Sequence, residues 1–114
     1  MRKYIVLYTA PLTAAERFAQ VTSEQAQQGM QLWFDWKEKL GPSLVDLGMQ
    51  LGNAAKVTKS GVTKADSNIV GMSVLQANSM DEALEMVKGH HHLQWAEGAE
   101  ITLLEEMPIP ELQG

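Results

Sequence analysis

The chain contains no cysteine. Disulfide bonds, thiol catalysis and thiolate metal sites are therefore excluded, and a cytoplasmic location is the default expectation. No apolar run approaches the ~20 residues that a membrane span requires, so no membrane association is predicted. Arg2 and Lys3 begin a stretch that resembles a secretion signal, but Pro11 interrupts it, and Thr13 with Glu16 forms a capping box where a cleavage region would lie.

Positive charge is scarce. Nine Lys and Arg residues against 14 Asp and Glu residues give a formal net charge of −5. An acidic protein repels phosphate backbones, so nucleic-acid binding is not expected. The only loose basic cluster, Lys56, Lys59 and Lys64, has no aromatic residue within it and is interpreted as a solvated edge.

The length of 114 residues and a hydrophobic content of 45% predict one globular domain over residues 1–114. Its clearest pattern is a strand over residues 69–77, apolar on both faces, which is typical of an interior strand. Ser79 and Glu82 then form a capping box for a helix whose apolar stripe must pack on the sheet, and Gly89 supplies the left-handed residue at its end.

Residues 3–9 are also apolar on both faces and predict a second central strand. Residues 54–60, which carry lysines, predict an edge strand followed by a polar loop over 61–68, and residues 100–107 predict the last strand. A short helix is expected over residues 13–20 and a longer one from its cap at Thr22 to Gly41. Gly29 in the longer helix is expected to allow close approach of a neighbouring backbone.

The resulting order, βαββαβ, is typical of a ferredoxin-like α+β fold with a four-stranded antiparallel sheet. The first and third strands would lie in the centre and both long helices on one face. The helices cannot cover both faces, so the apolar residues of the other face predict a homodimer through the open sheet faces.

Several stretches resemble the YCII-related proteins, including the DGPF branch: MRKYIVLYTAP, LVDLGMQL, GMSVLQANSMDEALEMVKGHHHLQ and EITLLEEMPIP. The resemblance implies a ferredoxin-like protomer that dimerises into an α+β barrel. It also implies a His-Asp pair as acid-base machinery, and a few relatives act in aromatic or chlorinated-aromatic metabolism. The DGPF tetrapeptide is missing here and no histidine precedes residue 90, which leaves His92, in its His-Leu step, as the best-matched histidine.

The three histidines at positions 90–92 suggest two kinds of site, a metal site and an acid-base pair. Alternate residues of an extended segment would aim His90 and His92 at a common point, but no second ligand cluster with suitable spacing exists, so neither a metal nor a cofactor is expected. An acid-base pair needs a carboxylate that orients a histidine, and Asp46 with His92 is the predicted pair. The alternatives are that Asp46 caps a turn and that His92 is exposed beyond the helix end.

Residues 41–53 are expected to form an ordered, apolar connection that lines a pocket, with Trp33 or Trp36 as an apolar wall. Both tryptophans are also candidates for the core or an interface. Two functions remain open. One is acid-base chemistry of the lyase or elimination type on a small aromatic or carbonyl compound, and the other is a non-catalytic small-ligand-binding or structural dimeric module.

Overall fold

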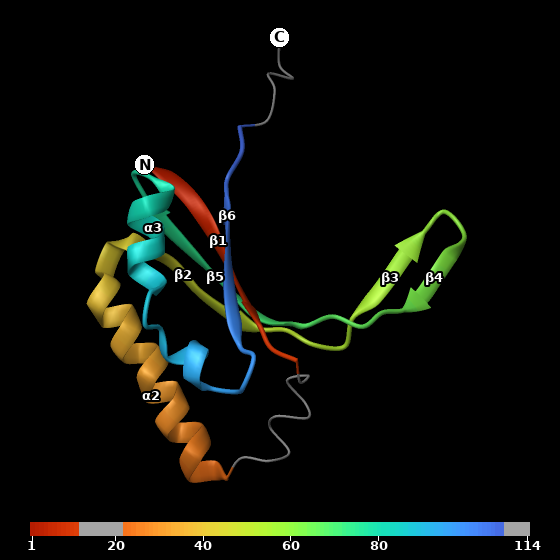
Figure 1. The fold of residues 1–114 in the computed structure, drawn as a ribbon, viewed down its shortest axis with the longest axis horizontal. Helices are drawn as coiled ribbons and strands as arrows, with labels where there is room; N and C mark the ends of the chain where they lie inside the picture. Colours follow the sequence, from red (N-terminus) through yellow and green to blue (C-terminus); the bar gives the residue numbers. More distant parts are fainter. Residues whose placement is uncertain (12–21, 109–114) are drawn as a thin grey trace.

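The computed structural model describes residues 1–11 and 22–108, which form an α+β structure (Figure 1). The elements are β1 (Arg2–Thr9), α2 (Ser23–Leu40), η1 (Gly41–Ser43), β2 (Leu44–Gln50), β3 (Ala55–Thr58), β4 (Gly61–Lys64), β5 (Ile69–Ala77), α3 (Met80–Val87), η2 (His91–Gln94) and β6 (Glu100–Glu105). The short helix expected over residues 13–20 lies outside the described residues. None of the described helices is both long and apolar enough to cross a membrane.

Four strands form one antiparallel sheet in the order β2-β5-β1-β6. The prediction that the first and third apolar strands lie in the centre is confirmed, since β1 and β5 are the two inner strands. Val6 of β1 lies opposite Ser73 of β5 on one side and Leu103 of β6 on the other. The rows of side chains therefore run across the sheet and alternate between its two faces.

The predicted position of the second strand is wrong. Residues 44–50, expected as a loop, form the edge strand β2, whereas residues 55–58 pair only with β4 in a separate two-stranded hairpin. The pairing of β2 with β5 shifts register twice, and Gly48 within it has a φ of 92°. These irregularities break the period of two that identifies a strand in a sequence, which is why an apolar but non-alternating segment looked like a loop.

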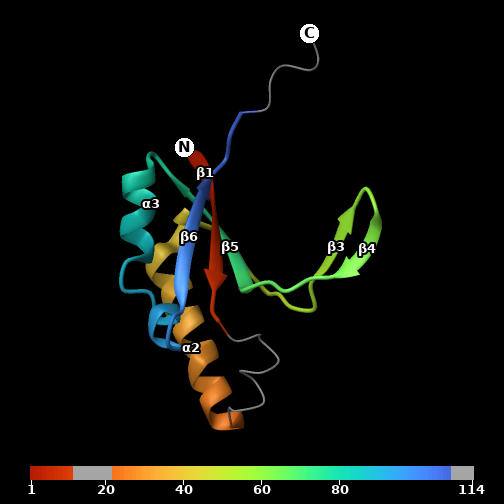
Figure 2. The same ribbon diagram turned by 45° about the vertical axis from the view of Figure 1, so that its right-hand side comes forward.

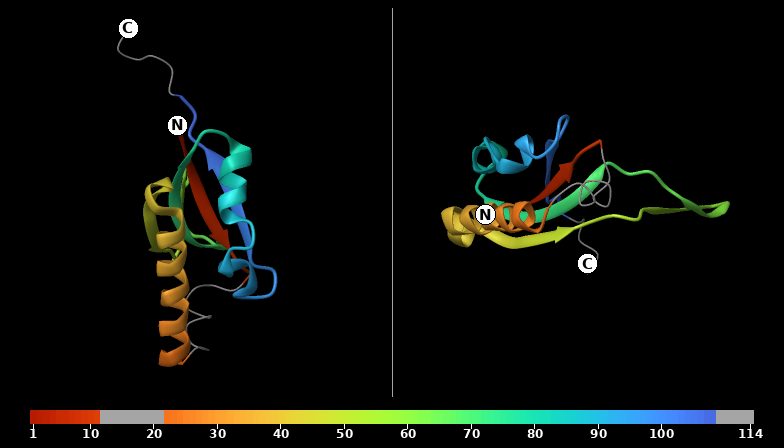
Figure 3. Two further views of the ribbon diagram at one scale, coloured as in Figure 1. Left: turned by 90° about the vertical axis from the view of Figure 1, so that its left-hand side faces the viewer. Right: turned by 90° about the horizontal axis from the view of Figure 1, so that it is seen from below.

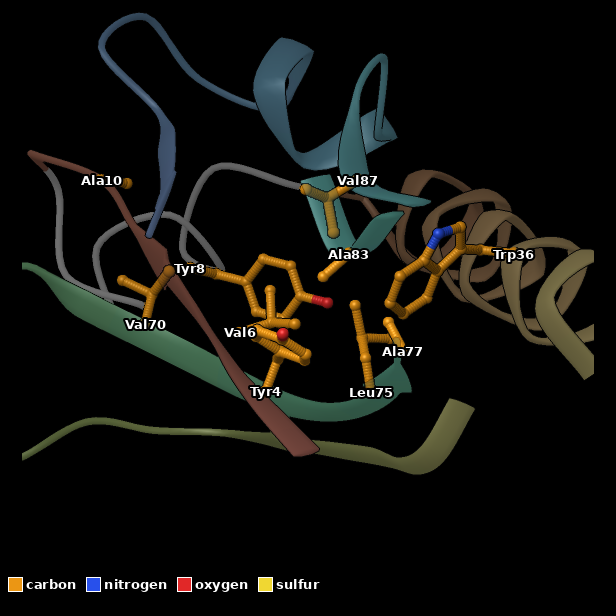
Figure 4. Packing of buried hydrophobic residues seen from close by; sticks show 10 residues of the cluster. All are labelled: Tyr4, Val6, Tyr8, Ala10, Trp36, Val70, Leu75, Ala77, Ala83 and Val87. Atoms are coloured by element: carbon orange, nitrogen blue, oxygen red, sulfur yellow. The ribbon is translucent and has the colours of Figure 1, made fainter. Parts of the chain in front are cut away.

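Both helices lie on one face of the sheet, as predicted (Figures 1 and 3). We call this the closed face. Its core contains side chains from the two central strands, from α3 and from α2 (Figure 4): Tyr4, Val6, Tyr8, Leu75, Ala77, Ala83, Val87 and Trp36. The Trp36 indole donates a hydrogen bond to the carbonyl of Met86 at 3.1 Å, which ties α2 to the end of α3.

The helix boundaries follow local signals. Thr22 and Gln25 form the predicted capping box, with bonds of 3.1 and 3.0 Å between each backbone N–H and the other side chain. Ser79 Oγ accepts from the backbone N–H of Glu82 at 3.1 Å and begins α3. Gly89, at a φ of 71°, turns the chain away from α3 as predicted.

The other face of the sheet, which we call the open face, has no described helix over it (Figures 1 and 3). It carries a row of apolar residues from three strands, all of them partly or well exposed: Ile5, Leu7, Met72, Val74 and Leu104. The closed face alone therefore forms the core of a single chain.

Candidate functional site

A cavity of about 990 Å³ lies between the N-terminal half of α2, parts of β2 and β5, and the η2 turn. Aromatic and histidine side chains form part of its wall: Tyr8, Trp33, His91, His92 and Trp95. Glutamines and apolar residues supply most of the rest, including Gln25, Gln50, Gln94, Met30, Met49 and Met72. Among the described residues that line it there is no Asp, Glu, Lys or Arg.

The histidine segment is a tight turn and not an extended strand. After Gly89 ends α3, His90 caps η2, and its Nδ1 accepts a hydrogen bond from the backbone N–H of His92 at 2.9 Å. The expectation that an extended backbone aims His90 and His92 at one point is therefore wrong. The alternative of an exposed His92 is wrong too, because only 4% of His92 is exposed.

His92 is held by the end of β1. Its Nε2 donates a hydrogen bond to the carbonyl of Thr9 at 3.0 Å. A carbonyl can only accept, so Nε2 carries the proton and Nδ1 holds the lone pair of the neutral ring. Burial lowers the pKa of His92, although hydrogen bonding to the backbone of Thr9 and Glu100 opposes that change. The ring is consequently neutral at pH 7, with its tautomer fixed by the backbone.

His90 and His91 stack on each other with centroids 4.1 Å apart, and the Nε2 atom of each is buried without a hydrogen-bond partner among the described residues. The edge of Trp33 meets the His91 ring at 4.5 Å. Burial, followed by the proximity of the other histidines, lowers the pKa of His90 to about 3, and burial lowers the pKa of His91 as well. The cluster therefore adds no positive charge at neutral pH.

Tyr8 forms part of the cavity wall and links three strands. Its hydroxyl lies 2.9 Å from Ser73 Oγ, and the Ser73 hydroxyl donates to the carbonyl of Leu47. Because Ser73 uses its only proton on Leu47, Tyr8 is the donor in the first bond. Burial raises the pKa of Tyr8, so its hydroxyl stays protonated and acts as a structural donor between β1, β5 and β2.

The structure separates the predicted site residues. Trp33 lines the cavity, whereas Trp36 is buried in the core beside it. Asp46 is exposed and pairs across the strands with Val74 of the open face, and its carboxylate accepts from the backbone N–H of Gly48 at 2.8 Å. Within one chain, Asp46 and His92 therefore lie on opposite faces of the sheet and are not brought together. The catalytic role of either residue stays a prediction.

The segment 41–53 does line the cavity, as expected, through Leu47, Gly48, Met49 and Gln50. Sequence reasoning missed Tyr8, His91 and Trp95 as wall residues. Trp95 follows His92 by three residues in a turn, and its ring stacks on His92 with centroids 5.6 Å apart. The three-residue spacing between His92 and Trp95 was the one signal in the sequence that could have identified Trp95 as a wall residue. No group of three or more His, Asp or Glu side chains that could hold a metal occurs in the described part of the chain.

No protein-family model matches this chain, and a search of curated proteins found no significant match.

Proposed function

We propose that the cavity binds a small, uncharged, largely aromatic molecule. The observation that carries this proposal is a wall rich in aromatic rings with no charged side chain among its described residues. A charged ligand would lose its hydration there without gaining a counter-ion from the described wall, which is strongly unfavourable. Rings such as Tyr8, Trp33 and Trp95 instead favour edge-on or offset contacts with another planar ring. The volume of about 990 Å³ suits a ligand of that size.

The polar groups of the wall restrict the ligand further. His92 is neutral, with Nε2 occupied by Thr9, so Nδ1 is the atom of this ring that can accept a hydrogen bond. Glutamine side chains can donate or accept. The proposed ligand is therefore an aromatic molecule with at least one neutral donor, such as a phenol or an aromatic amide.

Calorimetry and thermal shift with matched pairs of compounds test this proposal. Neutral phenols and aromatic amides should bind at least about tenfold more tightly than the corresponding benzoates. Trp33→Ala should weaken that binding by about tenfold, because it removes one aromatic wall. Phe34→Ala is the matched control, since Phe34 is the next residue of α2, is exposed and does not line the cavity. Equal or tighter binding of the carboxylates would refute the proposal.

A second candidate is acid-base chemistry, of the lyase or elimination type, on a small aromatic or carbonyl compound. A neutral imidazole with a fixed tautomer in a cavity wall supports it, because such a ring can take a proton at Nδ1. Thr9, and not Asp46, is the group that orients His92 within one chain. A backbone carbonyl can perform that orienting role.

For this second candidate, His92→Gln should abolish turnover of a compound that binds while leaving its affinity within about threefold. His91→Gln is the control, because His91 lies in the same wall but its Nε2 has no hydrogen-bond partner among the described residues. Turnover that survives in His92→Gln would exclude His92 as the base. Binding without any turnover in the native protein would leave the ligand-binding function alone.

We further propose that the protomer is ferredoxin-like, related to the YCII-related proteins, and that two copies pack their open faces together as a dimeric α+β barrel. The strand order β2-β5-β1-β6 with both helices on one face supports the first point. The apolar row of the open face supports the second, because monomers rarely expose a contiguous patch of that kind. The lack of cysteine supports a cytoplasmic location.

Light scattering over a micromolar concentration series tests the dimer. Val74→Lys should weaken association by at least about tenfold, because Val74 lies in the centre of the open face. Gln27→Lys adds the same charge to an exposed position of α2 and should leave the mass unchanged. A native protein that stays monomeric throughout the series would refute the dimer.

A further inference from the structure

The β3–β4 hairpin projects away from the rest of the molecule (Figures 1 and 2). We call residues 55–64 the arm. Every residue in its two strands is exposed, and Val57 and Val62 are 77% and 72% exposed. These two valines lie directly opposite each other, so they share one face of the arm, while Lys56 and Thr63 share the other. Ala55 and Lys64 lie on the valine face at the base of the arm, so this face is apolar towards the tip of the arm, whereas the opposite face is polar.

This arrangement is unfavourable for a chain on its own. A two-stranded hairpin is marginally stable in water unless a hydrophobic face packs on something. Exposure of the two valines to solvent provides no stabilisation. Among the described strands, β3 and β4 pair only with each other. A surface beyond the described part of this chain is therefore the physical explanation for an ordered arm with an apolar face.

The direction of the arm identifies that surface. The arm leaves from the ends of β2 and β5 on the side of the sheet away from both helices (Figure 1 and the right view of Figure 3). That side is the open face. A second copy seated on the open face would lie directly beside the arm, and by two-fold symmetry each arm would reach the other copy.

The charge of the arm fits the same occupant. Lys56, Lys59 and Lys64 give it three positive charges, and it contains no carboxylate. Since the whole chain carries −5, the remainder of the chain carries −8. A second copy is therefore acidic outside its own arm, and this opposite charge favours its association with a basic arm.

We propose that the arm of each copy packs its Val57–Val62 face on a second copy of this chain, with the arm lysines near the acidic surface of that copy. This inference rests on the proposed dimer and adds a segment to its interface. Association would then stabilise the hairpin of the arm and extend the contact beyond the sheet.

A pair of variants on the two faces of the arm tests the proposal. Val57→Asp places a carboxylate on the apolar face, and Thr63→Asp places the same charge on the polar face one residue from Val62. Sedimentation equilibrium should show a dimer dissociation constant at least about tenfold higher for Val57→Asp and less than about threefold higher for Thr63→Asp. Because the arm lies outside the core, both variants should keep the unfolding transition of the native monomer.

Hydrogen exchange of the native protein provides the second measurement. Amides of residues 55–64 should be protected above the dimer dissociation constant and lose protection on dilution below it. The proposed arm contact would be refuted, and the dimer retained, if the arm amides of the dimer exchanged as fast as those of the monomer. The same conclusion would follow if Val57→Asp and Thr63→Asp weakened the dimer equally. Protection independent of concentration would place the arm on its own chain and also overturn it. A native protein that is monomeric at all concentrations would refute the dimer and the arm together.

Discussion

The two faces of the four-stranded sheet are made by alternate residues of the same strands, yet they differ in what covers them. On the closed face Tyr4, Val6 and Leu75 are fully buried by the two helices. On the open face their neighbours Ile5 and Val74 stay partly exposed. Apolar residues on both sides of a strand therefore place it in the interior of the sheet, but the described helices cover one face only.

The candidate functional side chains are also divided between the two faces of the sheet. Tyr8 and His92 belong to the closed side and reach the cavity, whereas Asp46 projects from the open side. The pairing of Asp46 with His92, inferred from the apolar loop and the family-like turn, joined two groups that the sheet holds apart within one chain. The histidine instead obtains its orientation from the Thr9 carbonyl, a backbone group that no side-chain pattern can reveal.

The strongest test of the two faces compares two lysine substitutions. Val6→Lys should lower the free energy of unfolding by roughly 4 kcal/mol or more, because it places a charge in the fully buried centre of the closed face. Val74→Lys should change the stability of the monomer by less than about 1 kcal/mol, because that side chain can reach water. Urea unfolding at a concentration that keeps the protein monomeric measures both. Equal losses would show that the faces are not distinct.

The next largest effect is expected at Gly48, where β2 approaches β5. A Cβ built there would lie 1.6 Å from the carbonyl oxygen of Met72, and the φ of 92° is unfavourable for any L side chain. Gly48→Ala should therefore destabilise the protein by roughly 3 kcal/mol. Gly29→Ala is the control: contrary to expectation, a Cβ at Gly29 meets no atom of the described residues within 4 Å, and the helix should gain about 1 kcal/mol. Urea unfolding measures whether each variant has a lower or a higher free energy of unfolding than the native protein.

Acidification should weaken the closed side. The pKa of buried His90 is lowered to about 3, while the unfolded chain keeps the ordinary value of 6.5. Between these values the unfolded chain binds more protons, so stability is present above pH 6.5 and is lost as the pH falls. From pH 7 to pH 5 the loss from His90 alone should be about 2 kcal/mol.

The residues whose rings contact His90 are uncharged at neutral pH: Tyr8, Trp33, Trp36 and His91. None of these residues has a carboxylate that could stabilise a protonated His90. Thermal unfolding from pH 7 to pH 5, repeated with His90→Gln, measures the effect. An identical pH dependence in the variant would exclude His90 as its source.

The smallest effect concerns two tyrosine hydroxyls on the closed face. Tyr8→Phe removes a buried hydrogen bond to Ser73 and should cost about 1 kcal/mol. Tyr4→Phe removes a part-buried bond to Glu105, whose carboxylate keeps its bond to Arg2, and should change stability by less than about 0.5 kcal/mol. Chemical unfolding of both variants decides whether the Tyr8 hydroxyl supports the cavity wall. The reverse ranking would contradict that role.

Local signals in the sequence determined much of this protein. The central positions of β1 and β5 follow from apolar residues on both sides of each strand, and the starts of α2 and α3 follow from Thr22 and Ser79. The end of α3 follows from Gly89. Each of these features depends on residues within a few positions of one another, so a pattern along the chain contains the information.

The tertiary structure decided the rest. The strand β2 exists because an irregular backbone is held against β5, and the cavity exists because Trp33, Tyr8 and His92, far apart in the chain, lie around one space. The neutral state of His92 depends on burial, and the position of its proton depends on a carbonyl 83 positions away. Such contacts depend on the packing of whole elements, whose energies are sums over distant partners, and no local period or spacing records them.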